Sequence, residues 1–456
     1  MKVLIEGLGP DAVALARLLA SEGDEVRLAG TTGAGDREAL AALDLRELGV
    51  VVEPNADLDT DPGPADLAYL DVWTPETAAR VQRLRAQGSR VSCLGDLLLE
   101  RWAGATIGIT GTAGKTSTTR LTAEILLLAG IDVAVSRGAR AGNLWPTDDL
   151  LAALGRGGTA SRVLLLELTS SHLAFMHHSP GLAAVISFWP DHLELHGSLE
   201  RYRAAKETIV RHQRPGDVVV VNADDASAGF ASATPARRVE ISLHRPVERG
   251  AFLDPALGVV LVEEGVETSL GHIEGSSAHP ANVLAAAAIA SAAGAPASAV
   301  AEAVGTAATP PWRAEPCGEL AGVTVIDDGM AATPAKTAAL LSRQPGHSIV
   351  LVAGGLADAG GGPVHSAPEE IEILDRACDE VARAARAVVV FGEAGPRLAR
   401  LLRPRGVEVV EVTDLAAAVT AAARLAPGAG AVIFSPLFPV ALADRARFAE
   451  LVDRCG

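Results

Sequence analysis

Short apolar runs rich in β-branched residues alternate along the chain with stretches that have the length and periodicity of helices. The clearest strand-like runs cover residues 3–6, 25–28, 105–110, 162–167, 217–221, 323–328, 348–353, 387–392 and 430–436. Runs of this length, separated by helical segments, are typical of βαβ units and of mainly parallel sheets. The pattern therefore predicts the α/β fold class.

The chain of 456 residues is long enough for roughly two to four domains. We expect three: a Rossmann-like domain over 1–102, a central P-loop ATPase domain with a mainly parallel sheet over 103–308, and a Rossmann-like domain over 309–456. The Pro, Ala and Thr cluster at 306–311 is the best linker. The very Ala-rich helix within 275–293 is expected to be a close-packed interdomain helix.

The segment 105–128 reads as a strand, a glycine loop and a helix. Glycines allow successive backbone N–H groups to face an anion, and the helix N-terminus adds positive potential. Lys115 would reach the terminal phosphates of ATP, and the Thr116 hydroxyl would hold Mg²⁺. Ile109 departs from the usual phosphate-loop pattern, which has glycine six positions before the lysine. The competing interpretation is a tight turn that happens to contain lysine.

Further polar residues follow predicted strands. Glu167 ends one strand, and Asp191 and His192 lie just past another. Because ligands bind at the carboxyl ends of parallel strands, these groups are well placed to meet a metal bound to phosphate. The alternative interpretation of the Asp-His pair is a solvated loop. Lys206 lies on a charged predicted helix, and from the sequence alone it is interpreted only as a solvated side chain.

The first domain begins with a strand and the glycine turn Gly7-Leu8-Gly9. The third glycine of the dinucleotide fingerprint is replaced by Ala12, and no acidic residue ends the second strand, where Ala29 and Gly30 stand. NAD binding is therefore not expected. A Rossmann-like nucleotide pocket of another type remains open.

The amino-acid composition limits the classes of molecule that the protein is expected to bind. Aromatic residues are only 3%, so the cores must be aliphatic, and the net charge of −17 disfavours duplex nucleic acid and anionic membranes. No charged-then-apolar leader and no run of about 18 apolar residues is present in the sequence, which predicts a cytoplasmic protein without membrane insertion. The four cysteines lack pair spacing and are expected to be free thiols. Without coiled-coil heptads, we expect a monomer.

Taken in order, these motifs resemble the Mur ligase family of peptidoglycan biosynthesis, over nearly the whole chain. The matching segments are Thr110–Thr116, Glu167–Ser170, Asp191-His192 with His196–Ser198, Ala204–Lys206, Asn222–Asp225, Asn282, Trp312–Glu315, and Asp328 with Pro334. The family loop also lacks the first glycine, so Ile109 is no objection. The resemblance implies an ATP-dependent ligase that forms an amide bond through an acyl phosphate, acting on small molecules, with glutamate and a UDP-muramoyl acceptor as the first expectation.

The resemblance also implies residue roles. Lys115, Lys206 and His192 would be catalytic, and Lys206 would be carbamylated. Thr116, Glu167, His192 and Lys206 would bind Mg²⁺, as two ions in the family pattern. The residues implied for ATP are Gly111, Thr112, Gly114, Lys115, Thr116, Ser117, Asn282, Arg313 and Asp328. Those implied for the other substrates are Gly7, Gly9, Asn143, Ser170 and Ser435.

Several positions depart from the family pattern. Ala113 and Ser187 stand where asparagine is usual, Met330 replaces a lysine, and Leu356-Ala357-Asp358 replaces Asp-Gly-Lys. Losing a charged contact to a carboxylate costs on the order of 1.5–3 kcal/mol. Two alternatives therefore stay open: a family member that joins a different acid and amine, for example in secondary metabolism, and a non-catalytic ATP-binding homologue.

Overall fold

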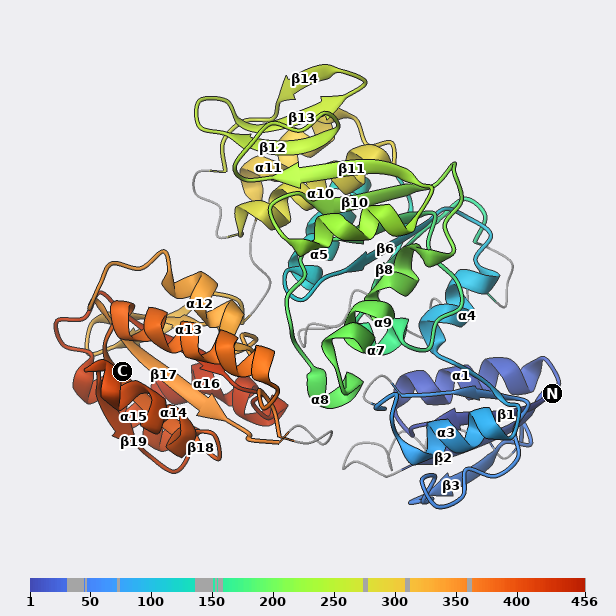
Figure 1. Ribbon diagram of the computed structural model, residues 1–456, viewed down its shortest axis with the longest axis horizontal. Helices are drawn as coiled ribbons and strands as arrows, with labels where there is room; N and C mark the ends of the chain where they lie inside the picture. The colour runs from blue at the N-terminus through green and yellow to red at the C-terminus, as the bar shows by residue number, and fades with distance from the viewer. Residues whose placement is uncertain are drawn as a thin grey trace. The chain divides into compact units, whose positions relative to one another are not determined.

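The computed structural model describes residues 1–30, 45, 47–71, 74–135, 151, 154, 159–273, 278–307, 312–358 and 363–455 (Figure 1). Three sheets, each mainly parallel, confirm the α/β class. The described chain divides into two compact units. One holds the described residues up to 307 except 190–194, and the other holds 190–194 and the described residues from 312 onward. The first two sheets belong to the first unit and the third sheet to the second. The boundaries at 102 and 308 stay predictions.

The first sheet has the strand order β3-β2-β1-β4-β5, with every pair parallel. Its elements are β1 (Lys2–Glu6), α1 (Pro10–Ser21), β2 (Glu25–Gly30), β3 (Val51–Pro54), β4 (Leu67–Tyr69), α3 (Ala79–Ala86), β5 (Arg90–Ser92) and α4 (Leu94–Arg101). The strand order reverses beside β1, which creates a crevice at the carboxyl ends of β1 and β4.

The second sheet has the order β14-β13-β12-β11-β10-β9-β6-β8-β7. Its strands are β6 (Thr106–Thr110), β7 (Val133–Ala134), β8 (Val163–Glu167), β9 (Leu182–Val185), β10 (Val218–Asn222), β11 (Arg237–Ser242), β12 (Gly250–Asp254), β13 (Gly258–Glu263) and β14 (Val266–Ser269). The helices nearby in sequence are α5 (Lys115–Leu128), α7 (Ser170–Leu173), α8 (Leu193–His196), α9 (Leu199–Arg211), η1 (Ala226–Ala233), α10 (Pro280–Ala292) and α11 (Ala297–Thr306). The β12–β13 and β13–β14 pairs are antiparallel and all other pairs of this sheet are parallel. Strands β13 and β14 form an edge that sequence reasoning did not predict.

The prediction of an interdomain helix at 275–293 is wrong. Every residue from Val283 to Ala290 is buried, and α10 packs against α5 and against β10, β11 and β12. The alanines have no long side chain to hold the backbones apart, so α10 lies close to its neighbours within a single core. The helix thereby supports the start of α5, where the phosphate loop ends.

The third sheet has the order β15-β16-β20-β17-β18-β19, with only β15 and β16 antiparallel. Its strands are β15 (Glu315–Leu320), β16 (Val323–Asp327), β17 (Ile349–Gly355), β18 (Ala385–Gly392), β19 (Glu408–Glu411) and β20 (Ala431–Leu437). Its helices are α12 (Pro334–Leu341), α13 (Pro368–Ala384), α14 (Gly395–Leu402), η2 (Arg403–Arg405), α15 (Leu415–Leu425) and α16 (Leu442–Cys455). One apolar cluster lies under α12, α13 and α14, and another lies under α15 and α16. Helices therefore cover both faces of this sheet.

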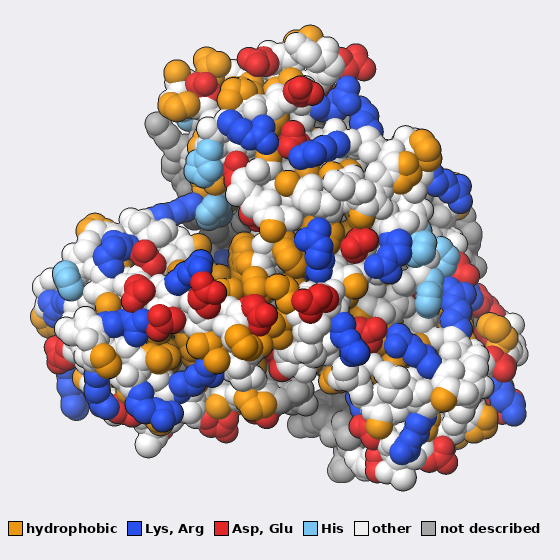
Figure 2. Space-filling view, in the orientation of Figure 1, with side chains coloured by type: hydrophobic (Ala, Val, Ile, Leu, Met, Phe, Trp, Pro, Cys, Tyr) orange, Lys and Arg blue, Asp and Glu red, His pale blue; other side chains and the backbone are white. Residues whose placement is uncertain are grey.

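The surface and the cysteines add two observations. On the face shown in Figure 2, basic and acidic side chains of the described residues are interspersed. Cys93 and Cys378 are buried, and the four cysteines, all within the described ranges, are free thiols as predicted. Within those ranges, no helix has both the length and the apolar character needed to cross a bilayer.

A buried carboxylate joins the first two sheets. Asp96 on α4 is 0% exposed, and its Oδ1 accepts hydrogen bonds from the backbone N–H groups of His177 (2.7 Å) and His178 (3.0 Å). Its Oδ2 accepts one from the Ser92 hydroxyl at 2.8 Å. Because several donors converge on one buried anion, α4 is fixed to the loop that follows α7.

We expect Asp96→Ala to lower the free energy of unfolding by about 3–5 kcal/mol, because it leaves buried donors without their acceptor. Asp132→Ala is the control, since this exposed carboxylate makes only a surface ion pair with Arg162, worth about 1 kcal/mol or less. Urea unfolding followed by circular dichroism measures both. Equal losses in the two variants would contradict the structural role of Asp96.

Candidate active site

The predicted phosphate loop joins β6 to α5. Gly114 has φ +84°, in the left-handed region that favours glycine, and a Cβ atom there would overlap Oδ1 of Asn282. Asn282, in the first turn of α10, therefore lies against the loop, as its implied role in ATP binding requires. With Gly114 as N-cap, the 14-residue helix α5 directs its N-terminus at the loop. This arrangement suits a phosphate group.

Ser187, a departure from the family pattern, holds the loop in place. Its hydroxyl accepts a hydrogen bond from Ala113 N and donates one to Ala113 O, both at 3.0 Å. The Ser187 carbonyl accepts a further bond from Thr112 N at 3.1 Å. A short hydroxyl side chain thus satisfies both backbone groups of Ala113, so the loop is ordered without the usual asparagines.

Lys115 and Thr116 begin α5 at the end of this loop. The Lys115 ammonium donates to Gly111 O at 2.8 Å and to Thr112 O at 3.4 Å, so it lies over the loop. The Thr116 hydroxyl donates to Glu167 Oε1 at 2.9 Å, and both side chains are buried. Ser117 follows in the same turn and is also buried.

The Thr116 and Glu167 pair fits Mg²⁺, which prefers hydroxyl, carboxylate and phosphate oxygens. Among the residues that the structure describes, no group of three or more His, Cys, Asp or Glu forms a metal cluster. A Mg²⁺ ion at this pair would therefore take further ligands from substrate phosphate and water, which is the usual mode for this ion.

Lys206 is buried in the same unit. It is 1% exposed, its Nζ lies 5.0 Å from the Tyr202 ring centre, and it donates to Thr110 Oγ1 at 3.4 Å. The Tyr202 hydroxyl shares a hydrogen bond with Thr112 Oγ1 at 2.9 Å. The structure therefore brings Lys206 to the base of the phosphate loop, and the interpretation as a solvated side chain is wrong.

Ser170 begins α7, directly after the strand that carries Glu167. Its hydroxyl lies 3.0 Å from His196 Nε2, and both side chains are buried. Thr169 caps the same short helix in a capping box with His172. Burial, together with the charge of Lys115, lowers the pKa of His172 well below its usual value. This histidine is therefore neutral near pH 7.

His192 and Asp191 belong to the second compact unit. The two ring nitrogens of His192 lie 3.6 Å from Asp191 Oδ2 and 3.3 Å from Glu194 Oε1. Burial lowers the pKa of His192, but the two carboxylates outweigh it, and the net shift is upward. Metal ligation requires a neutral ring, so the upward shift in the pKa of His192 opposes ligation of Mg²⁺ by this side chain.

Asp328 follows β16, Ser435 lies within the neighbouring strand β20, and the two side chains are hydrogen-bonded to each other. Ser435 Oγ donates to Asp328 Oδ2 at 2.8 Å and pairs with Thr337 Oγ1 at 2.8 Å. Ala314 N donates to Asp328 Oδ1 at 3.2 Å, which places the backbone beside Arg313 at this carboxylate. Burial raises the pKa of Asp328 to about 7 and that of Asp327 to about 6.

The raised pKa of Asp328 makes stability depend on pH. The folded state holds this proton more tightly than the unfolded chain, so the stabilising contribution is present below about pH 4 and is lost as pH rises to about 7. Asp328→Asn removes that loss. We expect the variant to gain up to about 4 kcal/mol relative to wild type between pH 4 and pH 8. Urea unfolding at both pH values measures it.

Asp453→Asn, at an exposed position of α16, is the control and should follow wild type at both pH values. If wild type and Asp328→Asn show the same change in unfolding free energy from pH 4 to pH 8, the burial of a costly charge at Asp328 is refuted.

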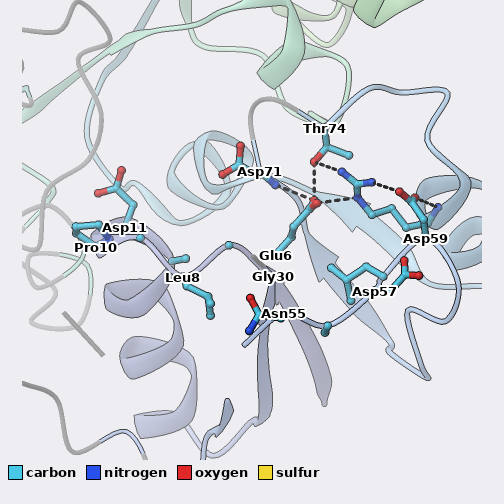
Figure 3. A pocket seen from close by; sticks show the side chains of 16 residues that line it. Glu6, Leu8, Pro10, Asp11, Gly30, Asn55, Asp57, Asp59, Asp71 and Thr74 are labelled. Atoms are coloured by element: carbon cyan, nitrogen blue, oxygen red, sulfur yellow. Dashed lines mark hydrogen bonds and ion pairs between the residues drawn. The ribbon is translucent and has the colours of Figure 1, made fainter. Parts of the chain in front are cut away.

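A cavity of about 720 Å³ opens at the carboxyl edge of the first sheet (Figure 3). Gly7 and Gly9 line it, together with the start of α1. Its charged lining residues are Glu6, Asp11, Asp57, Asp59, Asp71 and Arg80. The cavity therefore lies where the topology predicts a ligand, with a lining that carries more acidic than basic groups.

Arg80 is held by two of these carboxylates. Its guanidinium lies 2.7 Å from Glu6 Oε1 and 2.7 Å from Asp59 Oδ2, and Thr74 Oγ1 donates to Glu6 Oε2 at 2.6 Å (Figure 3). Burial raises the pKa of Glu6, although Arg80 and Thr74 oppose this shift. The arginine is thus already engaged within the cavity wall.

Comparison with known proteins covers both the sequence and the fold. Residues 109–255 match the Mur ligase middle domain, and residues 312–436 match the "Mur ligase, glutamate ligase domain". The UDP-N-acetylmuramoylalanine–D-glutamate ligase of Symbiobacterium thermophilum is 32% identical over 95% of this chain and 92% of its own. The enzyme of the same name from Rubrobacter xylanophilus is 34% identical over 95% and 93%. This chain belongs to the Mur ligase family.

Solved structures agree with this fold. The MurC ligase of Thermotoga maritima covers the whole chain with a TM-score of 0.61 at 20% identity. MurF of the same organism, solved with ADP, covers 99% of this chain and 97% of its own with a TM-score of 0.59 at 16% identity. As a Mur ligase, the protein is an ATP-dependent ligase, and the implied family membership is confirmed.

The structure of this Mur ligase groups the predicted residues in three places. Around the phosphate loop it gathers Gly111, Thr112, Gly114, Lys115, Thr116, Ser117, Glu167, Lys206 and Asn282. In the second unit lie His192, Arg313, Asp328 and Ser435, and Gly7 and Gly9 line the first-sheet cavity. Asn143 lies outside the described residues. The roles of all these residues stay predictions.

Sequence reasoning missed several contributors to the site of this Mur ligase. Ser187 was read as a loss, yet it orders the phosphate loop. Tyr202 was not singled out, although it contacts both Thr112 and Lys206. Glu6 and Arg80 were not connected, because only the fold brings them together. The one signal in the sequence was the position of Glu6 at the end of the first strand.

Proposed function

We propose that this Mur ligase joins glutamate to the carboxylate of UDP-N-acetylmuramoyl-L-alanine, with hydrolysis of ATP to ADP. It works as a cytoplasmic monomer with two Mg²⁺ ions. The observation that carries the proposal is the ordered phosphate loop with the Thr116 and Glu167 pair beside it. The relatives that carry this name support the choice of substrates, since they match over almost the whole chain.

The chemistry takes two steps. A carboxylate oxygen of the acceptor attacks the γ-phosphorus of ATP, which forms an acyl phosphate and releases ADP. The amine nitrogen then attacks the acyl carbon, and phosphate leaves from the tetrahedral intermediate as the amine loses a proton. Both steps spread negative charge, which Lys115 and the N-terminus of α5 would stabilise. Bound Mg²⁺ supplies further charge neutralisation at the phosphate oxygens.

Lys206 would act as a carbamate. Its neutral amine adds CO₂ to form an N-carboxylate and releases one proton, so that a cation becomes an anion with two metal-binding oxygens. The burial of Lys206 beside Thr110 and Tyr202 supports this role, because the loop that would hold phosphate and metal lies next to it. This group would help to ligate a second Mg²⁺.

The remaining predicted residues bind substrates. Asn282, which lies against Gly114, would contact the nucleotide, and Arg313 and Asp328 would contact it from the third domain. Ser170 and Ser435 would contact the substrates that are joined. Asn143, outside the described residues, keeps its predicted role in substrate binding.

The acceptor would bind in the first-sheet cavity. Its diphosphate would need the backbone N–H groups of the Gly7 to Gly9 turn and of the first turn of α1, since Arg80 is engaged by Glu6 and Asp59. Sugar hydroxyls are donors and would suit the carboxylates that line the same cavity.

The acidic lining of this cavity also favours a second candidate, a Mur ligase that joins another acid and amine. Met330 and Asp358, which stand where cations were expected, point in the same direction. A non-catalytic ATP-binding homologue is the third candidate. A non-catalytic homologue is expected to have lost Lys115, Glu167 or His192, and all three residues are present in this chain.

A substrate screen tests the proposal. Purified protein with ATP, Mg²⁺ and UDP-N-acetylmuramoyl-L-alanine is offered each D- and L-amino acid, and phosphate release and product mass are measured. We expect D-glutamate to give the fastest amine-dependent release. Faster turnover of another amine, or of another acceptor, would establish the second candidate. No amine-dependent release with any pair would favour the third.

A further inference from the structure

Helix α16 places an arginine where the family pattern has a lysine on the loop after β16. That lysine position is Met330 in this chain, and Arg445 Nη1 lies 2.9 Å from the Met330 sulphur. The two residues are 115 positions apart in sequence. The positive charge that the loop has lost is therefore present at the same place, carried by α16.

Arg445 lacks strong acceptors. A thioether is a weak hydrogen-bond acceptor, and the buried Nε of Arg445 has no hydrogen-bond partner among the described residues. Within the described ranges, no ion pair of 4 Å or less involves this guanidinium, although Asp327 contributes a favourable charge from farther away. Burial lowers the pKa of Arg445, but an arginine stays protonated at neutral pH. A half-buried guanidinium with most donors unused is suited to an anion.

Lys336 provides a second cation near Arg445. It lies in the first turn of α12, next to Thr337, whose hydroxyl bonds Ser435. The loop that Arg445 contacts at Met330 leads directly into this helix. Burial and the charges of Arg313 and Arg445 lower the pKa of Lys336, and the charges of Asp191 and Asp328 oppose this shift. In the part of the chain that the structure describes, Lys336 forms no ion pair within 4 Å. Two cations are thus associated with the segment from Met330 to the first turn of α12, and no carboxylate of the described residues forms an ion pair within 4 Å with either.

We propose that Arg445 and Lys336 bind a carboxylate of the amino-acid substrate and so determine which amines the enzyme accepts. This inference rests on the proposed function, because it names the group by which the third domain holds the incoming amine. The segment that matches the "Mur ligase, glutamate ligase domain" ends at residue 436, before Arg445. The guanidinium fork matches a carboxylate with two parallel hydrogen bonds, and Lys336 adds a point charge.

Phosphate is the other anion that such cations could bind. Two observations favour the carboxylate. The buried side chains of Asp327 and Asp328 are close by, and they would repel a doubly charged phosphate more strongly than a singly charged carboxylate. The phosphate loop has its own cation, Lys115, and its own helix N-terminus.

The test compares Arg445→Met, Lys336→Met and a matched control, Arg447→Met, which removes an exposed arginine from the same helix. Calorimetry measures binding of D-glutamate, L-glutamate and D-aspartate to protein with ATP analogue and Mg²⁺. Steady-state assays measure KM for the best amino acid from the screen and KM for ATP. We expect Arg445→Met and Lys336→Met to weaken amino-acid binding about 10- to 100-fold. KM for ATP and all constants of Arg447→Met should stay within about threefold of wild type.

Arg445→Lys keeps the charge without the fork and should lose about tenfold, and circular dichroism confirms that each variant folds. A change in KM for ATP alone would assign the pair to phosphate and overturn the proposal. So would a best substrate without a carboxylate, or no carboxylate amino acid bound by wild type. Binding that depends on Arg445, without turnover of UDP-N-acetylmuramoyl-L-alanine, would overturn the proposed function and leave this inference intact.

Discussion

Lys115→Ala should slow amine-dependent phosphate release by about 10²- to 10³-fold. The Lys115 ammonium lies over the phosphate loop, where it donates to the carbonyl oxygens of Gly111 and Thr112. Transferring a phosphoryl group spreads charge over its oxygens, and a fixed cation stabilises that state more than it stabilises bound ATP. The measurement is kcat and KM for ATP with saturating acceptor and amine.

Glu124→Gln, at an exposed position of the same helix, is the control and should leave kcat unchanged. Because Lys115 is only half-buried, the alanine variant should unfold close to the wild-type temperature. Wild-type turnover in Lys115→Ala would remove the assignment of the loop to ATP.

Lys206→Met should lose activity by at least about 10²-fold if the lysine works as a carbamate that ligates Mg²⁺. Methionine keeps most of the buried volume, so the core around Tyr202 should stay packed and the loss should not come from unfolding. Activity should return in part with high bicarbonate or a short-chain carboxylate in Lys206→Ala, because that variant leaves room for the anion.

Two further variants sharpen this test. Lys206→Arg keeps a cation but cannot form a carbamate, so it should be as inactive as Lys206→Met. Arg201→Met, at an exposed position of α9, should match wild type. Mass spectrometry of wild-type protein under CO₂ should detect the adduct. An active Lys206→Arg enzyme would rule out the carbamate.

Local sequence patterns correctly predicted the fold class and the position of the phosphate loop. The strands that end near Glu167 and Asp327 lie where the sequence predicts them, because each is defined by neighbours a few positions away. The Ala-rich helix was recognised as a helix, but its place was wrong. Alanine side chains are small and apolar and can pack against many different neighbours. The sequence of an Ala-rich helix therefore does not show which hydrophobic core the helix belongs to.

The roles of single polar residues depended on distant partners. Ser187 reads as a missing asparagine until the fold brings it to Ala113, 74 positions away. Lys206 reads as a surface lysine until α9 turns it toward Thr110, 96 positions away. A charged side chain is stable in water but needs partners when it is buried, and whether it is buried depends on the assembled fold.

The sequence by itself determined that this protein has an ATP-binding loop of the Mur ligase type in an α/β chain, because the glycines, the lysine and the flanking strand and helix are contiguous. It also located the departures at Met330 and Leu356-Ala357-Asp358. Only the tertiary structure decided that a cation is still present beside Met330, since Arg445 reaches it from another helix. The charge at a binding site depends on which side chains meet there in the fold, and no single segment of the sequence shows which distant residues will meet.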